Sequence, residues 1–179
     1  MAQIVVGQTV GVTGSAAITV KESMQGASLY LDSVNAQGGV GGQKIELVVL
    51  DDKFDTKLTL ENARTLIEKH GAIALFMTRG TPHTQGIVPL LDEAGVVLVG
   101  PSTGAMALHK PVSRHVFNVR APYQVEVEKA ITHLNTLGVE RIGVIHVDDS
   151  FGADALSGAL NGFKAQGTQA LFIEKFDRS

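Results

Sequence analysis

Hydrophobic positions along the chain follow two different spacings. In five segments apolar residues recur every three to four positions, which is the spacing of an amphipathic helix. These segments are residues 20–34, 60–67, 87–94, 127–134 and 156–163. A glycine follows each segment, and a left-handed residue at a helix C-terminus favours glycine because it has no Cβ. The five glycines are Gly38, Gly71, Gly95, Gly138 and Gly167.

Short, nearly continuous apolar runs separate the helical segments. These runs are residues 4–6, 45–50, 73–77, 96–99, 142–147 and 170–176. Such runs are typical of strands buried on both faces of a parallel sheet. Because strand and helix alternate, right-handed crossover connections are expected. The pattern therefore predicts an α/β fold with a doubly wound parallel sheet.

The alternation is interrupted between residues 102 and 123, where Pro101, Pro111 and Pro122 prevent any long helix. We interpret this stretch as the crossover between two lobes, with residues 1–120 forming the first and residues 121–179 beginning the second. Only two strands and two helices are predicted after it, and two strands alone do not make a stable sheet. On this pattern we expect the first lobe to lack its C-terminal return elements and the chain to be a piece of a longer protein.

Composition narrows the classes of function. The 179 residues contain no cysteine, which excludes thiolate metal sites and cysteine nucleophiles. Fifteen Lys and Arg against eighteen Asp and Glu give a net charge of −3, and no basic run is present, so nucleic acid is not an expected partner. The apolar runs are too short to span a bilayer. The N-terminus enters a strand pattern at once, so we expect either a cytoplasmic protein or a mature form without its signal peptide.

Several motifs resemble catalytic or metal-binding patterns without meeting their requirements. Residues 100–104 read G-P-S-T-G, like a serine nucleophile elbow, but no histidine follows the later acidic residues to close a Ser–acid–His triad in the hydrolase order. The glycine-rich residues 38–44 follow a helix and precede a strand, the reverse of a phosphate loop. The six histidines lack metal-ligand spacing, so no metal is expected. The acidic pairs at residues 51–52 and 148–149 are interpreted as helix caps and loop acceptors.

Hydroxyl residues follow two neighbouring predicted strands. Thr81 and Pro82 read as the N-cap and first residue of a helix, while Ser102 and Thr103 read as caps of a short turn toward Leu108. Two helix N-termini at the carboxyl edge of a parallel sheet present free N–H groups to an anion. The sequence thus predicts a carboxylate or phosphate site, with simple helix capping as the alternative.

The ordered motifs resemble those of one known family. They comprise residues 26–27, 35–42, 44–47, 51–52, 95–102 and 148–152. Together they are similar to the type I periplasmic binding proteins, in particular the branched-chain amino-acid group of ABC transporter solute-binding proteins. The resemblance extends over residues 4–176, and family members are about twice as long.

The resemblance implies a two-lobed clamp that closes on a small molecule, with no enzymatic activity and no cofactor. It implies that the ligand's carboxylate meets Thr81 and the segment Ser102, Thr103 and Gly104. It further implies that Phe151 of the second lobe covers the ligand and that Thr19 touches its side chain. The implied partner is a membrane permease, the only link to a membrane, and the implied location is the periplasm.

The chain departs from the family pattern at two of these positions. Members that bind amino acids usually carry Thr or Ser where this chain has Gly104, and often Tyr or Trp where it has Thr19. Arg79 and His83 beside the predicted site admit other carboxylates, including aromatic acids. Two alternative functions remain at this point: a cytoplasmic ligand-sensing regulator of the same fold, and an α/β hydrolase that uses Ser102.

Overall fold

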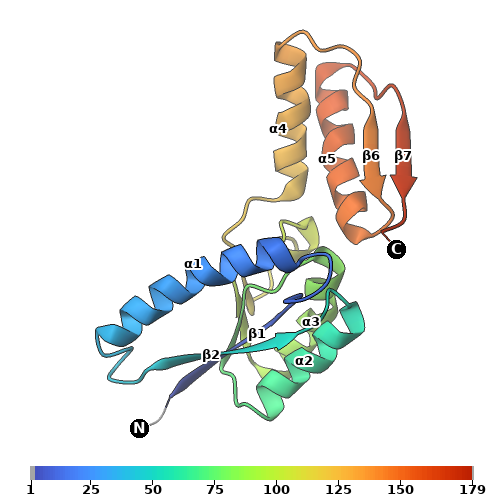
Figure 1. The fold of residues 1–179 in the computed structure, drawn as a ribbon. Helices are drawn as coiled ribbons and strands as arrows, with labels where there is room; N and C mark the ends of the chain where they lie inside the picture. The colour runs from blue at the N-terminus through green and yellow to red at the C-terminus, as the bar shows by residue number, and fades with distance from the viewer. Residues whose placement is uncertain (1–2, 179) are drawn as a thin grey trace. The chain divides into compact units, whose positions relative to one another are not determined.

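The computed structural model describes residues 3–178 and divides into two compact units (Figure 1). The first unit runs to Ser102 and also includes Arg114–Phe117. The second comprises Thr103–Ser113 and continues from Asn118 to the end of the described chain. β4 and β6, the strands on either side of the proline-rich stretch, belong to separate sheets. The predicted lobe limit at residue 120 stays a prediction.

The first unit is built on a five-stranded, wholly parallel sheet in the order β2-β1-β3-β4-β5. Its strands are β1 (Ile4–Val10), β2 (Ile45–Asp51), β3 (Ala74–Phe76), β4 (Val97–Val99) and β5 (Val116–Phe117). β1 pairs with β2 along its full length and with β3 on its other side. The predicted doubly wound α/β fold is therefore confirmed.

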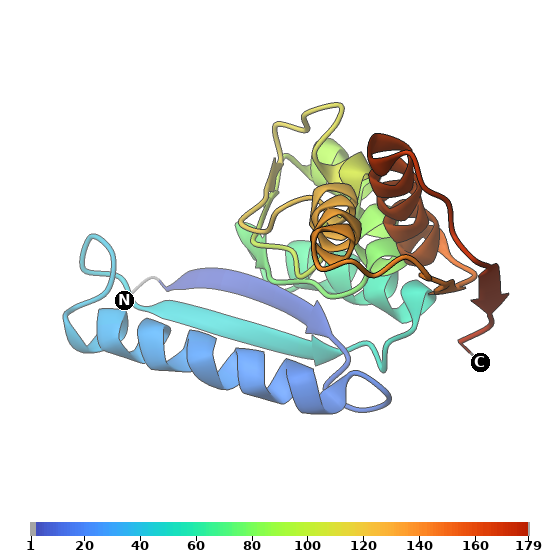
Figure 2. The same cartoon turned by 90° about the horizontal axis from the view of Figure 1, so that it is seen from above.

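Helices lie on both faces of this sheet. α1 (Ala17–Ala36) lies on one face, and α2 (Thr56–Glu68) and α3 (Thr81–Ala94) pack together on the other (Figures 1 and 2). The core on the α2 and α3 side contains fully buried Leu66, Leu75 and Ile87. On the α1 side, Val10 of β1 packs with Ala16 and Val20.

The second unit holds a two-stranded parallel sheet covered by two helices. Its elements are η1 (Met106–Leu108), α4 (Tyr123–Thr136), β6 (Val144–Val147), α5 (Ser150–Gln166) and β7 (Ile173–Phe176). α4 and α5 lie side by side over a core of Ile131, Ala159 and Phe163 (Figure 1). No helix in the described part of the chain is both long and apolar enough to cross a bilayer.

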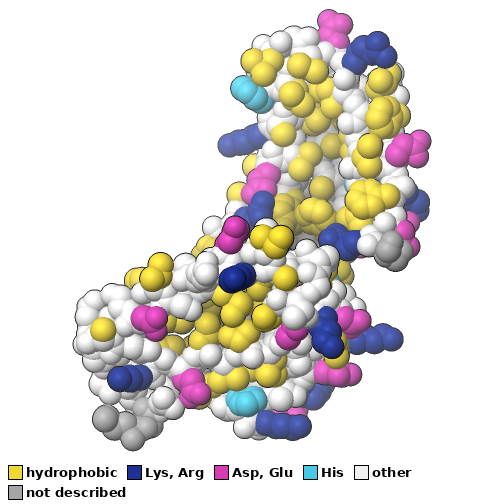
Figure 3. Space-filling model, viewed as in Figure 1, with side chains coloured by type: hydrophobic (Ala, Val, Ile, Leu, Met, Phe, Trp, Pro, Cys, Tyr) yellow, Lys and Arg dark blue, Asp and Glu magenta, His cyan; other side chains and the backbone are white. Residues whose placement is uncertain are grey.

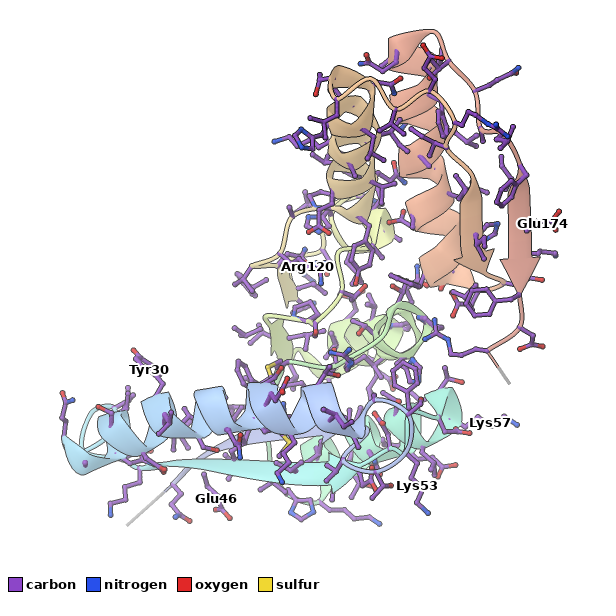
Figure 4. The ribbon with its side chains drawn as sticks, turned by 45° about the horizontal axis from the view of Figure 1, so that its top comes forward. Tyr30, Glu46, Lys53, Lys57, Arg120 and Glu174 are labelled. Atoms are coloured by element: carbon purple, nitrogen blue, oxygen red, sulfur yellow. The ribbon has the colours of Figure 1, made fainter. Side chains whose placement is uncertain are left out.

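Two expectations about strands are wrong. The first concerns β5, which the proline-rich stretch concealed and which is held by the β4 amides: Leu98 N–H donates to His115 and Gly100 N–H to Phe117. The second concerns burial in the second unit. All four residues of β7 are exposed, and Figure 4 shows Glu174 pointing away from α5. Exposed apolar side chains cover part of this unit in Figure 3. The exposed apolar residues of this unit include Ile145, Phe172, Ile173 and Phe176.

Candidate functional site

The topology of the first unit predicts a crevice at the carboxyl edge of its sheet. After β1 the chain leads through α1 to β2, which lies on one side of β1, and β3 lies on the other side of β1. α1 begins beyond the carboxyl end of β1, and α3 begins beyond the carboxyl end of β3. Because these helices lie on opposite faces, the ends of β1 and β3 are a topological switch point, where open α/β sheets bind ligands. Predicted residues Thr81 and Ser102 lie at this edge.

Thr81 is the first residue of α3 and is only 1% exposed. The predicted capping register is wrong by one position, because Gly80 is the N-cap and Pro82 follows Thr81 inside the first turn. Gly80 has φ of 93°, a left-handed value that a side chain disfavours. A Cβ on Gly80 would also lie 2.5 Å from Nδ1 of His83. The turn that presents Thr81 therefore depends on glycine.

Ser102 is joined to the end of β3 by its backbone. Its N–H donates to the carbonyl of Thr78 at 2.7 Å, and Ser102 forms an isolated parallel bridge with Arg79. Ser102 and Arg79 line a small cavity of about 10 Å³ together with Ser23 of α1, at the lower limit for one water molecule. The first unit thus brings Ser102 next to the turn that leads into Thr81.

The local structure around Ser102 does not match a nucleophile elbow. That motif needs a strand, a sharp turn and a helix in direct succession. Here irregular chain follows β4, and the next helix is the three-residue η1, with Ala105 at its N-cap. The expected cap of this turn by Ser102 and Thr103 is also wrong, because Ala105 is the N-cap and no side chain caps the turn. Thr103 Oγ1 instead accepts the N–H of Ala105 at 3.3 Å. The hydrolase hypothesis therefore loses its structural basis.

Thr103 and Gly104 belong to the second unit. Thr103 is fully buried, and the carbonyl of Gly104 accepts the N–H of Tyr123 at 2.7 Å. A Cβ on Gly104 would lie 2.4 Å from the carbonyl oxygen of Ala121. This close approach explains why the chain has glycine where the resembling family usually has Thr or Ser.

Phe151, the second residue of α5, is half-buried and packs within the second unit. Asp149 is the N-cap, as expected, and accepts the N–H groups of Phe151 and Gly152 at 2.9 and 3.0 Å. The ring of Tyr123 meets Phe151 edge-on at 5.2 Å, and the guanidinium of Arg178 lies over Phe151 at 5.8 Å. Tyr123 therefore links Gly104 to Phe151, a connection that the sequence pattern did not reveal.

Arg120 and Arg178 place positive charge around this aromatic pair. The guanidinium of Arg120 lies 4.7 Å from the centre of the Tyr123 ring and pairs with Glu126 at 2.9 Å. The hydrogen bond from Arg120 to Glu126 raises the pKa of the arginine, so its charge is fixed. Arg178 pairs with Asp149 at 2.9 Å. Figure 4 shows Arg120 on the segment that leads into α4.

Thr19 lies in the first turn of α1, apart from these groups. Its side chain is exposed, and its hydroxyl donates to the carbonyl of Ala16 at 3.1 Å. A groove of about 890 Å³ runs along α1 and is lined by apolar side chains such as Val12, Met24 and Leu29. None of the predicted site residues lines this groove.

The acidic pair after β2 forms a hydrogen-bond network. Asp52 is 1% exposed and accepts the hydroxyls of Thr9 and Thr59 at 3.1 and 3.0 Å. Partial burial alone would raise the pKa of Asp51. Hydrogen bonds from the hydroxyl and N–H of Thr13 and from other backbone N–H groups have the larger combined effect, so the pKa lies below 3.8. These acids are loop acceptors as expected.

The expected helix cap lies elsewhere, because Asp55 is the N-cap of α2. Within residues 3–178 no three His, Asp or Glu side chains are arranged to hold a metal ion.

His83 lies two residues after Thr81 in the sequence, beside the predicted site. Its side chain is buried and stacks on Phe54 with ring centroids 4.2 Å apart. Neither ring nitrogen has a hydrogen-bond partner among the described residues. His83 therefore packs as an aromatic ring behind the N-terminus of α3.

Comparisons with known proteins agree with this architecture. An amino acid binding protein of Pseudomonas aeruginosa is 30% identical over 165 residues, covering 90% of this chain and 44% of its own length. A substrate-binding periplasmic protein from Ralstonia solanacearum is 35% identical, with a TM-score of 0.92 over 98% of this chain and 50% of that one.

A third protein shows the fold alone: a Rhodopseudomonas palustris solute-binding protein of an ABC transporter, solved with benzoate, is 20% identical with a TM-score of 0.91. The match covers 99% of this chain and 49% of that protein. The chain thus spans about half the length of the relatives that it matches.

These relatives are binding proteins, not enzymes. The family model described as periplasmic binding protein matches residues 3–177, almost the whole chain. The chain therefore belongs to the periplasmic binding protein family, in the type I group that includes the branched-chain amino-acid binding proteins.

Proposed function

We propose that this chain is part of an extracytoplasmic solute-binding protein of an ABC importer, and that the protein captures a small carboxylate. The ligand is an amino acid or an aromatic or other organic acid, and the partner is the importer's membrane permease. The observation that carries the proposal is the switch-point crevice of the first unit, where Thr81 and Ser102 adjoin the start of α3. The family membership supports a binding function over catalysis.

The chemistry of the crevice suits a carboxylate. The N-terminus of α3 carries the positive end of the helix dipole, and its first turn contains no acidic side chain to occupy that end. Thr81 adds a hydroxyl that can donate a hydrogen bond, and Ser102 adds a second one. Hydrogen bonds to a charged group contribute about 1.5 to 3 kcal/mol each, so a few such contacts suffice for selective capture.

In the second unit, the proposed ligand contact is the aromatic ring of Phe151. In this proposal Phe151 covers the apolar part of the ligand, and Thr103 and Gly104 present backbone groups to the carboxylate. The cap by Asp149 and the packing of Tyr123 hold Phe151 in a fixed position. Thr19, which the family resemblance also implied, is proposed as a contact for the ligand's side chain.

Mass spectrometry of small molecules released from the complete gene product that contains this chain tests the proposal. We expect one predominant small carboxylate, released on denaturation and rebound by the refolded protein in a calorimetric titration. A denatured sample that releases a neutral sugar or a nucleotide would contradict the proposal. So would a purified protein that neither carries nor rebinds any carboxylate.

A further inference from the structure

Arg79 occupies the crevice of the first unit with its charge uncompensated. It lies between the end of β3 and the start of α3, and it is half-buried. Among the described residues its guanidinium makes no hydrogen bond and has no carboxylate within ion-pair distance. None of the five ion pairs in this part of the chain includes Arg79. A half-buried guanidinium loses part of its hydration, and an anion nearby would offset that cost.

The backbone holds Arg79 beside the proposed carboxylate position. Its isolated parallel bridge with Ser102 places these two residues side by side, and both line the same small cavity with Ser23. Gly80 alone separates Arg79 from Thr81. Arg79, Ser102 and the N-terminus of α3 therefore lie in one region of the first unit.

The acidic side chains at the end of β2 already have their own donors. Asp51 accepts hydrogen bonds from Thr13 and Lys53, and Asp52 accepts from Thr9, Thr59 and Phe54. Both carboxylates at the end of β2 therefore already accept hydrogen bonds from residues other than Arg79. The positive charge of Arg79 is left for a bound anion.

We propose that Arg79 binds the carboxylate of the ligand and selects organic acids that carry a net negative charge over zwitterionic α-amino acids. The inference rests on the proposed function and narrows its ligand class. A guanidinium fits a carboxylate with two parallel hydrogen bonds and keeps its charge at all physiological pH values. In an α-amino acid the ammonium group lies one carbon away, so its repulsion of Arg79 subtracts from the attraction of the carboxylate.

The decisive comparison uses two ligands that differ only in the ammonium group. We would titrate the complete gene product, stripped of bound molecules, with 4-methylpentanoate and with leucine. The proposal expects 4-methylpentanoate to bind at least about tenfold more tightly, which corresponds to about 1.4 kcal/mol. Leucine binding as tightly or more tightly overturns the inference and leaves the proposed carboxylate binding intact. A protein that binds neither compound overturns the inference as well, and the molecules released on denaturation then decide the proposed function separately.

Variants of Arg79 provide the second arm. Arg79→Gln should weaken 4-methylpentanoate binding about tenfold or more and narrow the difference between the acid and leucine. Arg79→Lys keeps the charge but loses the two-pronged geometry, so it should recover part of the affinity. The matched control is Arg64→Gln, because Arg64 lies on the exposed surface of α2 and pairs with Glu68. Arg79→Gln with unchanged affinity and unchanged selectivity, in a variant whose melting temperature matches the parent, overturns the inference.

Discussion

Removal of the Thr81 hydroxyl tests the proposed function. Thr81→Val keeps the shape of the side chain and removes its hydrogen-bond donor. Since a hydrogen bond to a charged group contributes about 1.5 to 3 kcal/mol, binding of the released native ligand should weaken roughly 10- to 150-fold. Calorimetry of the complete gene product measures the change.

The control for Thr81 comes from another helix. Thr56 is likewise the first residue of its helix, α2, but its side chain is exposed. Thr56 is not among the residues proposed to contact the ligand, so Thr56→Val should leave affinity unchanged. Equal affinities for the parent and Thr81→Val, or equal binding of an uncharged amide analogue, would contradict a carboxylate site at Thr81.

The close packing around Gly104 predicts that a larger residue at this position destabilises the protein. A Cβ there would meet the Ala121 carbonyl oxygen at 2.4 Å and the Tyr123 amide nitrogen at 3.1 Å, and both are backbone atoms that cannot rotate away. Gly104→Ala should therefore lower the free energy of unfolding by about 1 to 3 kcal/mol, the usual cost of overpacking. Urea denaturation measures this loss.

Gly26 provides the matched control for Gly104. It lies within α1, and nothing lies within 4 Å of a Cβ built on it. Gly26→Ala should raise the free energy of unfolding by about 0.5 to 1 kcal/mol, because alanine restricts the unfolded chain and favours a helix. A Gly104→Ala variant as stable as Gly26→Ala would show that the backbone near Ala121 moves freely.

At the scale of elements, the cap of α2 predicts a dependence of stability on pH. The N–H groups of Leu58 and Lys57 donate to Asp55 and lower its pKa below 3.8. Because the folded pKa is depressed, the unfolded chain binds the proton first as pH falls. The stabilisation by Asp55 is therefore fully present above pH 3.8 and is lost as pH falls through the folded pKa.

Replacing Asp55 by Asn separates this charge from the cap. Asparagine is an equally good N-cap residue but does not titrate. The urea midpoint of Asp55→Asn should fall less steeply than that of the parent below pH 3.8, while both proteins should have similar midpoints near neutral pH. Identical acid profiles for the two proteins would show that another carboxylate, such as Asp51, carries the dependence.

The hydrophobic pattern predicted the order of all five α-helices and of every strand except β5. Each helix begins earlier than its apolar pattern. Three of the five begin after a polar or glycine N-cap, namely Asp55, Gly80 and Asp149. β5 has two residues and exists only through hydrogen bonds to β4, which lies more than a dozen residues earlier in the chain. No local periodicity can indicate such a strand.

Some features of the candidate site could be predicted from the sequence, and others could not. Thr81 and Ser102 became candidates because hydroxyl residues after a buried strand signal a turn or a cap, although neither is the N-cap of its helix. The pairing of Arg79 with Ser102 depends on the alignment of β3 with β4, and the contact of Tyr123 with Phe151 depends on how α4 packs on α5. Neither contact has a signature within one segment, so both required the structure.

At the scale of the whole molecule, the two units differ in how their sheets are protected. β1 lies inside a five-stranded sheet with hydrogen-bonded neighbours on both sides, and its last four residues are buried. β7 has one neighbour, β6, and all of its residues are exposed. Local opening needs least free energy where few apolar contacts and many exposed backbone hydrogen bonds occur. The second unit should therefore open more often than the first.

Hydrogen exchange on the 179-residue chain measures this difference. Amides of β1 should exchange at least about a hundredfold more slowly than those of β7, which corresponds to about 2.8 kcal/mol in opening free energy. α5 is the internal reference, because it packs its buried Phe163 in the same unit as β7. If α5 exchanges slowly while β7 exchanges fast, the strand alone opens; if both exchange fast, the second unit opens as a whole. Equal protection of β1 and β7 would contradict the prediction, because it would require the two sheets to open in one cooperative step.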